Sequence, residues 1–451
     1  MKKTWLTCGL MIILGLAVLG CRSYHRNVQS VHADFYRNDL ARASEELSKQ
    51  KSKKVNRKNE DLMKLEESML HMCRGEFRQA ESLLREVRDR FDALENARLA
   101  NTAQKMASLL SDDNALPYAG EDYEKVMIRA MLAINSLLLD GEDARAYANQ
   151  INLKQQEIMA RSEVDPETGE KVKKSYRNVA LGPYICAILN QTSMMDQMET
   201  IREWTKVCQW APDFLPGKML LEHAKTTPHS RPGNGVLHIF VMLGRGPRKI
   251  QVNEPVTQLS LLLADQIVSA TSKHSVPPTI APVPIPKIET KPCRYRHVDV
   301  FLGEKLASRT VTLTDVNRMA REQFEVNKPW IVARAAARRV VKKAGIYGIK
   351  EASGVNSTGG EILLDLAGIA WELAEEADTR CWSLLPGEIQ VARIELPAGT
   401  HEIGLQGITP SPNDKTSLYR QTVTLEDGRN SYLFLYLADD GLIGNIQSQT
   451  P

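Results

Sequence analysis

Two adjacent carboxylates, Glu121 and Asp122, are the pair in this chain best suited to acid–base chemistry. A glycan hydrolase uses two carboxylates, one as the acid and the other as the base or nucleophile. The same residues stand where a helix is predicted to begin, and there Asp122 can cap free N–H groups while both charges favour the positive end of the helix. We expect the helix-start role, with catalysis as the alternative.

A second group, Asp378, Arg380 and Trp382, lies where a predicted acidic helix ends. Aspartate and arginine side chains form charge-assisted, often bidentate hydrogen bonds. The pattern therefore predicts a structural ion pair with the tryptophan packed beside it. A contact with a partner protein or with glycan is the alternative.

Motifs for metal or nucleophilic chemistry are missing from the sequence. The nine histidines are dispersed, with no His-x-His and no His-Glu-x-x-His spacing, so no zinc site is predicted. Ser48-Lys49-Gln50-Lys51 fits Ser-x-x-Lys only formally, because its surroundings are polar. We predict no catalytic residue, no metal and no cofactor.

The N-terminus carries the most specific chemical signal. Lys2 and Lys3 precede an uncharged, mostly apolar run over 5–19, which is too short for an ordinary membrane span. Gly20-Cys21 follows at once and resembles the bacterial lipobox, in which the cysteine thiol is lipidated and becomes the new N-terminus. The resemblance implies loss of residues 1–20 and stable anchoring by several acyl chains on Cys21. A secretory signal and a membrane-anchored start are the alternatives.

The position after Cys21 is arginine rather than aspartate. In Gram-negative lipoproteins this goes with the outer membrane, so the resemblance implies a lipid-anchored protein there, with the periplasmic face as the expected location. The chain has 58 Lys and Arg against 55 Asp and Glu, a net charge of +3. This balance supplies no strong field for a polyanion, and we expect no nucleic-acid partner.

Cysteine usage after the leader fits no disulfide framework. Five dispersed residues remain, with no Cys-x-x-Cys spacing, at 73, 186, 208, 293 and 381. Those in apolar helical patterns are expected to be buried thiols. A Cys186–Cys208 bridge stays open in an oxidising compartment.

Helical periodicity extends from about residue 28 to 224, as in Phe77, Ala80 and Leu84. A short pattern recurs at 38–43, 75–80 and 141–146, each time with a turn residue five positions before an alanine. It resembles tetratricopeptide repeats, whose period is about 34 residues. The resemblance implies helical hairpins in which the small alanine lets the second helix approach. An unrelated helical bundle is the alternative.

A basic helix near the C-terminal third carries Arg334, Arg338 and Lys342, and an acidic helix is predicted over 365–378. Opposite charges on two helices joined by a Gly-rich loop favour an antiparallel pair whose charges neutralise each other. An exposed basic face that binds a partner is the alternative. Pro329 is expected to open a new helix after a break.

The remaining sequence is rich in predicted strands. Residues 236–241 read as a strand that turns at 244–247 and returns at 249–252, before a helix over 257–272. Hairpins are expected at 296–313 and around Asp427-Gly428, and a bulge near Ala392-Arg393. The last strand, 432–437, is apolar on both faces and should be central.

Four segments together resemble a family of bacterial outer-membrane lipoproteins that has no assigned activity: the lipobox, Pro117 to Val126, Asp378 to Pro386, and Leu396-Pro397-Ala398-Gly399. The resemblance implies a tetratricopeptide-like N-terminal half and an α+β C-terminal half, and it carries no catalytic residues. The family is sometimes associated with lipoproteins that regulate peptidoglycan synthases.

These observations predict a mainly α N-terminal half of tetratricopeptide-like helical hairpins and an α+β C-terminal half with an antiparallel sheet. The expected parts are a signal peptide (1–20), a repeat domain (21–228), a strand pair and helix (229–275), a Pro-rich connector (276–292) and an α+β domain (293–451).

For function we expect a non-enzymatic, lipid-anchored scaffold whose helical repeats bind a protein or peptide partner in the cell envelope. A peptidoglycan-binding or synthesis-regulating lipoprotein and a cell-wall glycan hydrolase are the alternatives. The residues we expect at a partner contact are Glu121, Asp122, Arg334, Arg338, Lys342, Asp378, Arg380 and Trp382. The oligomeric state is left open.

Overall fold

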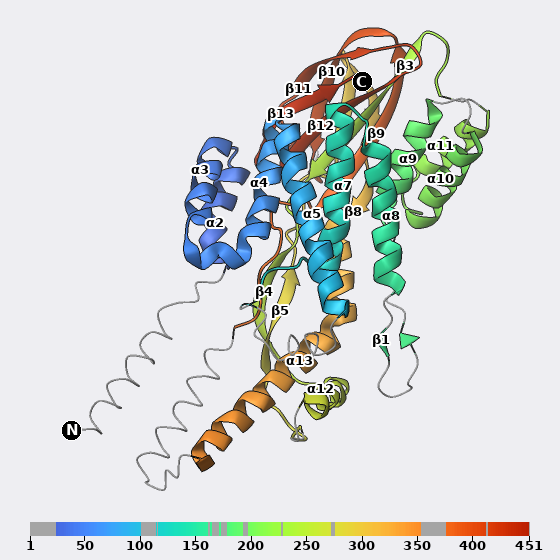
Figure 1. Cartoon of the computed structure of the whole chain (residues 1–451). Helices are drawn as coiled ribbons and strands as arrows, with labels where there is room; N and C mark the ends of the chain where they lie inside the picture. The colour runs from blue at the N-terminus through green and yellow to red at the C-terminus, as the bar shows by residue number, and fades with distance from the viewer. Residues whose placement is uncertain are drawn as a thin grey trace.

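The chain folds into a layer of helical hairpins packed on two stacked β-sheets, with a helical arm projecting from one end (Figure 1). The computed structural model describes residues 24–100, 114, 116–160, 163–164, 171–172, 178–192, 197–226, 229–271, 276–352, 376–411 and 414–450. The side chains of 25, 55, 98–100, 163–164, 171–172, 270–271 and 343–352 are excepted. The predicted fold class is confirmed, with helices mostly in the N-terminal half and sheets in the C-terminal half.

Neighbouring helices of the N-terminal half pack side by side as successive hairpins. Every residue of α7 from Tyr123 to Leu138 is buried, because other helices flank it and the sheet lies beneath it. The helical elements are α2 (Tyr24–Tyr36), α3 (Leu40–Lys51), η1 (Lys54–Asn59), α4 (Glu60–Arg74), α5 (Phe77–Ala100), α7 (Asp122–Leu139), α8 (Ala144–Ala160), α9 (Leu181–Gln191), α10 (Gln197–Trp210) and α11 (Pro216–Thr226). A short hairpin of β1 (Glu163–Val164) and β2 (Lys171–Val172) follows α8.

The recurring pattern falls at the turns between paired helices. Asn38, Gly75 and Gly141 all adopt a positive φ there, and such a left-handed residue is a common way to end a helix. Ala43 and Ala80 are fully buried in the second helices, as expected. In the third copy Ala146 is exposed instead, because α8 starts one residue later after its turn residue and so presents a different face.

A five-stranded sheet with the order β13-β12-β3-β9-β8 forms the central layer. Its strands are β3 (Asn234–Leu243), β8 (Val311–Asp315), β9 (Glu388–Pro397), β12 (Asn430–Ala438) and β13 (Gly441–Gln449). All pairs are antiparallel except β3 with β12, which is parallel. The predicted central position of β12 is confirmed, since every residue in it is buried.

The two faces of this sheet contribute to two separate cores. On β12, Tyr432, Phe434 and Tyr436 pack in the core shared with the helical layer. Leu433, Leu435 and Leu437 pack instead against the four-stranded sheet β11-β10-β6-β7. That outer sheet consists of β6 (His297–Leu302), β7 (Lys305–Arg309), β10 (Gly399–Ile408) and β11 (Tyr419–Leu425).

The sheet fills the inner side of the helical layer. Helix α4 packs on β13, and α7 packs on both β12 and β13. Phe35 of α2 makes an edge contact with the ring of Tyr436 at a centroid separation of 5.5 Å. The face that a free-standing array of hairpins would offer to a ligand is thus occupied by the protein's own C-terminal half.

Two predicted strand pairings were wrong because sequence-adjacent strands separate in space. Both edges of β3 are taken by β9 and β12, so β4 (Arg248–Glu254) pairs with β5 (Val283–Glu289) rather than with β3. The turn at Asp427-Gly428 links strands of different sheets. Strand β3 shares a sheet with strands from 293–451, across the predicted boundaries at 275 and 293.

Two further expectations fail for packing reasons. The bulge expected near Ala392-Arg393 is absent from the pairing of β9 with β3, which continues without a register shift. Apolar residues occur on both faces of β9 because Val391 packs in one core and Ala392 in the other. The Pro-rich stretch is more than a connector, since it supplies β5, in a two-stranded sheet where each strand has a free edge that tolerates proline.

A helical arm of α12 (Gln258–Thr271) and α13 (Val316–Ala352) projects beyond the layers (Figure 1). Pro329 lies inside α13 and does not end it, against expectation. An interior proline costs about 3 kcal/mol, but small side chains such as Ala333 and Ala337 let α13 pack closely on Leu263 and Ile267 of α12. That contact offsets the cost.

Candidate functional site

Residues 377–386 run between the helical layer and the sheet without belonging to any strand. Most of this segment is buried, and Trp382, Leu384 and Leu385 have no exposed surface. Buried backbone groups need hydrogen-bond partners. Since no strand supplies them, side chains from distant elements do, and these side chains form a buried polar cluster.

Glu66 of α4 holds two successive N–H groups of the segment. The N–H of Ser383 donates to Oε1 at 3.1 Å and the N–H of Leu384 donates to Oε2 at 3.0 Å. His32 of α2 contacts Oε1 at 3.2 Å. Glu66 is fully buried, so its carboxylate replaces a neighbouring strand for this stretch of backbone.

Glu124 of α7 holds the N–H group of the preceding residue of the segment, Trp382. Its Oε1 accepts the N–H of Trp382 at 2.7 Å, and its Oε2 accepts the N–H of Glu121 at 2.9 Å. The hydroxyls of Tyr118 and Tyr123 also donate to it. Burial raises the pKa of Glu124, the charge of Glu121 adds to this, and the donors offset part of the rise.

Tyrosine hydroxyls bind the carbonyl groups of the same segment. Tyr36 donates to the carbonyl of Ser383 at 3.2 Å, and the hydroxyl of Tyr436 lies 3.3 Å and 3.1 Å from the carbonyls of Leu384 and Leu385. We call the four side chains of Glu66, Glu124, Tyr36 and Tyr436 the clamp. The clamp joins helices α2, α4 and α7 to strand β12 through one stretch of chain.

The predicted Asp378–Arg380 ion pair is present at the start of this segment. The guanidinium group binds both carboxylate oxygens, with N–O distances of 2.9 Å and 2.8 Å. It also donates to the carbonyl of Leu116 at 2.8 Å and lies 5.3 Å from the ring centre of Tyr118. Arg380 is 4% exposed, so the pair is internal.

Glu121 and Asp122 point into different networks. The N-cap residue of α7 is Glu121, whereas Asp122 was expected to cap this helix. Glu121 also forms an ion pair with the buried Lys249 of β4. Burial would lower the pKa of Lys249, but the carboxylates of Glu121 and Asp378 outweigh it and hold that pKa above its usual value. The sequence-predicted Glu121, Asp378, Arg380 and Trp382 thus belong to one cluster.

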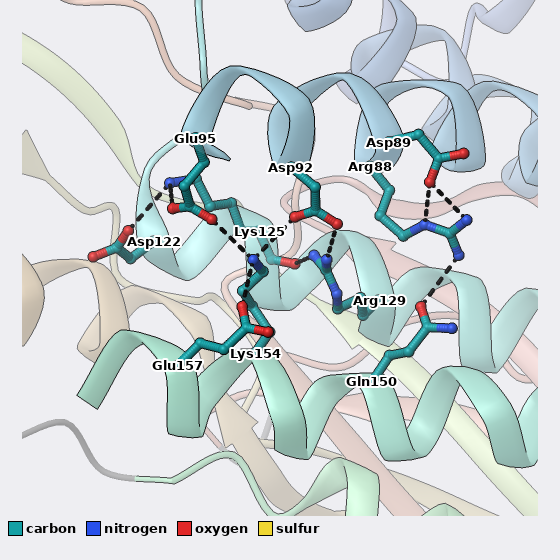
Figure 2. A network of polar contacts seen from close by, with 10 residues as sticks. All are labelled: Arg88, Asp89, Asp92, Glu95, Asp122, Lys125, Arg129, Gln150, Lys154 and Glu157. Carbon is teal, nitrogen blue, oxygen red and sulfur yellow. Dashed lines mark hydrogen bonds and ion pairs between the residues drawn. The ribbon is translucent and has the colours of Figure 1, made fainter. Parts of the chain in front are cut away.

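Asp122 belongs to a chain of ion pairs among α5, α7 and α8 (Figure 2). Its carboxylate lies 3.3 Å from Nζ of Lys125, which also binds Glu95 at 2.9 Å. Lys154 of α8 binds Glu95, Asp92 and Glu157 at 2.8–2.9 Å, and Arg129 binds Asp92 at 2.6 Å. The cationic side chains are nearly buried, so the chain fastens three helices together.

The basic residues Arg334, Arg338 and Lys342 lie on α13 and are half-buried. Each takes part in a polar or electrostatic contact. Their neighbour Arg339 donates to the carbonyls of Ala281 and Pro282 at 3.0 Å, which ties the arm to the Pro-rich stretch. Most of the predicted acidic partner helix, 365–378, lies outside the described residues, and the clamp cluster does not include this basic group.

Cys21 and the leader also lie outside the described residues. The five later cysteines, including Cys186 and Cys208, are free thiols. Within the described ranges, no group of three or more His, Cys, Asp or Glu side chains is placed to hold a metal ion. The same ranges contain no helix with the length and apolar character needed to cross a membrane.

Sequence reasoning missed Glu66, Glu124 and Lys249. A usable signal existed for the glutamates, since each stands among apolar residues on a helix that is otherwise core, as in Leu62, Leu65 and Met69 around Glu66. Such a glutamate needs buried donors. Which donors it finds depends on a segment more than 250 residues away.

The charged groups of the clamp cluster are paired: its carboxylates, ammonium and guanidinium groups have partners within the protein. Its geometry can hold an extended segment and fix the helical layer on the sheet. Comparison with family models, curated proteins and solved structures found no match to this chain.

Proposed function

We propose that this protein is a lipid-anchored, non-catalytic interaction protein of the bacterial cell envelope, tethered through Cys21 and facing the periplasm. Its partner is a protein or a peptide segment bound by the helical half. The inner face of the helical layer is covered by the sheet, so binding uses the outer helices and the far end of the layer.

The observation that carries this proposal is a set of highly exposed apolar side chains at the two ends of the hairpin formed by α10 and α11, the last helices of the layer. Met198 of α10, Leu215 just before α11, and Met219 of α11 are 78%, 71% and 76% exposed. Leu215 and Met219 lie four residues apart at the α10–α11 turn, and large apolar side chains this exposed and this close together are typical of sites that another macromolecule covers.

An interaction role fits the candidate acidic pair better than catalysis does. Glu121 is held by Lys249, and Asp122 by Lys125. A retaining or inverting glycan hydrolase needs one of its two carboxyl groups to be a protonated acid and both to flank the sugar. Two carboxylates fixed by separate lysines in separate networks are poorly placed for that task.

The tether is tested by metabolic labelling of the full chain with an alkyne fatty acid in a Gram-negative host. We expect label on the wild-type protein and none on Cys21→Ser, with the wild-type protein in the membrane fraction. An unlabelled wild-type protein released into the medium would contradict the lipid anchor.

The interaction is tested by placing a photo-crosslinking amino acid at Met219, with a control at Leu306, an exposed leucine on β7 of the outer sheet. We expect one reproducible protein adduct from position 219 and none from 306, and direct binding of that protein to the purified full chain. Sedimentation with purified sacculi in place of an adduct favours peptidoglycan binding, and muropeptide release that is lost in Glu121→Gln favours a hydrolase.

A further inference from the structure

A groove runs beside the first turns of α13, between the helical layer and strand β8. It consists of two adjoining hollows that share Asn178, Met319 and Glu322. One hollow opens toward α7 and α8 and the other toward the α10–α11 turn. The groove is therefore bounded by elements from both halves of the chain.

The floor of the groove is apolar. The first hollow is lined by Tyr123, Val126 and Ile158 of the helical hairpin, and Met319 faces them from α13. The second hollow is lined by Trp210, Phe214 and Leu313. Aromatic and methionine side chains of this kind are common anchors at protein-binding surfaces.

The edges of the groove are acidic. Asp122 and Glu322 line the first hollow, and Asp213 and Asp315 line the second. The cation among the lining residues is Arg318, which lies 3.9 Å from Asp213 and 3.8 Å from Asp315. Glu322 thus places an acidic side chain without an ion-pair partner among the described residues beside the apolar floor.

Two residues at the second hollow, Thr314 and Leu215, offer contacts to a chain segment. The hydroxyl of Thr314, which lines the second hollow and is 4% exposed, has no hydrogen-bond partner within the described residues. A buried hydroxyl without a partner is costly unless a ligand supplies one. The residue after Phe214 in the chain, Leu215, is 71% exposed, so a large apolar side chain stands next to the second hollow.

We propose that this groove binds a short segment of a partner protein that carries apolar side chains flanked by lysine or arginine. The apolar side chains enter the two hollows, a polar group of the segment meets Thr314, and the basic side chains face Glu322 and Asp213. The acidic edges disfavour anionic lipid headgroups and acidic peptides, which would place like charges together. This inference rests on the proposed interaction function and gives it a location and a partner chemistry.

The test measures binding of fluorescein-labelled 12-residue peptides to the purified full chain by fluorescence anisotropy. The probe peptide alternates leucine and phenylalanine with lysine and arginine. One matched peptide replaces every basic residue by glutamate, and another replaces every apolar residue by serine. We expect saturable binding of the probe, weakened by added salt, and at least tenfold weaker binding of both matched peptides.

Reversing the charges at the edges of the groove should abolish its preference for the basic peptide over the acidic one. The double variant Glu322→Lys with Asp213→Lys is expected to bind the probe about tenfold more weakly. The control Glu325→Lys changes an exposed acid on the same helix outside the groove and should stay within twofold of wild type. Far-UV circular dichroism checks that each variant is folded, and Met319→Ala supplies a second variant that changes the floor without a charge.

Equal binding of the basic and acidic peptides, no saturable binding of the probe, or equal affinity of the double variant and Glu325→Lys would each overturn the proposal. Binding to vesicles of anionic phospholipid that the double variant loses would also overturn it in favour of a membrane surface. The broader proposal fails separately. If the crosslinked envelope protein binds the double variant unchanged, the interaction function stands and the groove is not its site.

Discussion

Glu66 gives the sharpest test of the clamp. Replacing it with alanine leaves the N–H groups of Ser383 and Leu384 buried without an acceptor, and it opens a cavity next to His32. Each unsatisfied buried donor costs about 1–3 kcal/mol, so the loss of both partners in Glu66→Ala should lower the free energy of unfolding by about 2–6 kcal/mol. Glu66→Gln keeps one acceptor oxygen and should cost about 1–3 kcal/mol.

The neighbouring Glu67 is the matched control. It contacts Lys51 at 2.6 Å, and its side chain is 26% exposed. A partly exposed ion pair contributes about 0–1 kcal/mol, so Glu67→Ala should change stability little. Urea unfolding followed by circular dichroism and by tryptophan fluorescence measures all three variants. If Glu66→Ala and Glu67→Ala lose the same stability, the carboxylate does not hold the segment and the clamp interpretation is wrong.

Three further predictions concern buried ionisable groups. Burial holds the pKa of His238 well below its usual value. As the pH falls below about 6.5, the imidazole is protonated in the unfolded chain but not in the folded one, so stability should decrease. Urea midpoints at pH 7 and pH 5 should therefore differ less in His238→Gln than in wild type. Burial raises the pKa of Cys381 to about 12, so a thiol reagent should label the half-buried Cys208 first, which mass mapping can show; equal rates would contradict this. Glu121→Gln leaves the ammonium of Lys249 buried without its nearest counter-charge and should cost about 3 kcal/mol in urea unfolding, while an unchanged midpoint would refute the pairing.

Local chemistry predicted much of the helical half. The turn residues Asn38, Gly75 and Gly141 end helices as expected, because a left-handed backbone is a local property of those positions. The central position of β12 was also predictable, since a strand that is apolar on both faces must be covered on both. These features depend on side chains within a few residues of one another.

The remaining features depend on partners that are distant in the sequence. Strand β3 looked like the first half of a hairpin, yet it pairs with β9 and β12, which lie 150–200 residues further along. Pro329 predicted a helix break, but the small side chains of α13 pack on α12 and keep the helix intact. The roles of Asp378 and Arg380 were predictable as an ion pair, whereas the meeting of their segment with Glu66 and Glu124 was not.

The parallel pairing of β3 with β12 has a consequence for how the molecule is made. Strand β3 ends at Leu243, and its partner begins at Asn430, close to the end of the chain. A ribosome or export channel that delivers the chain from its N-terminus releases the helices long before β12 can cover them. Their sheet-facing side chains, such as those of α7, stay exposed to water until β12 has emerged. A chaperone that shields apolar surface should therefore raise the yield of the folded protein. Deleting β12 and β13 should leave an aggregating species even though every helix remains encoded.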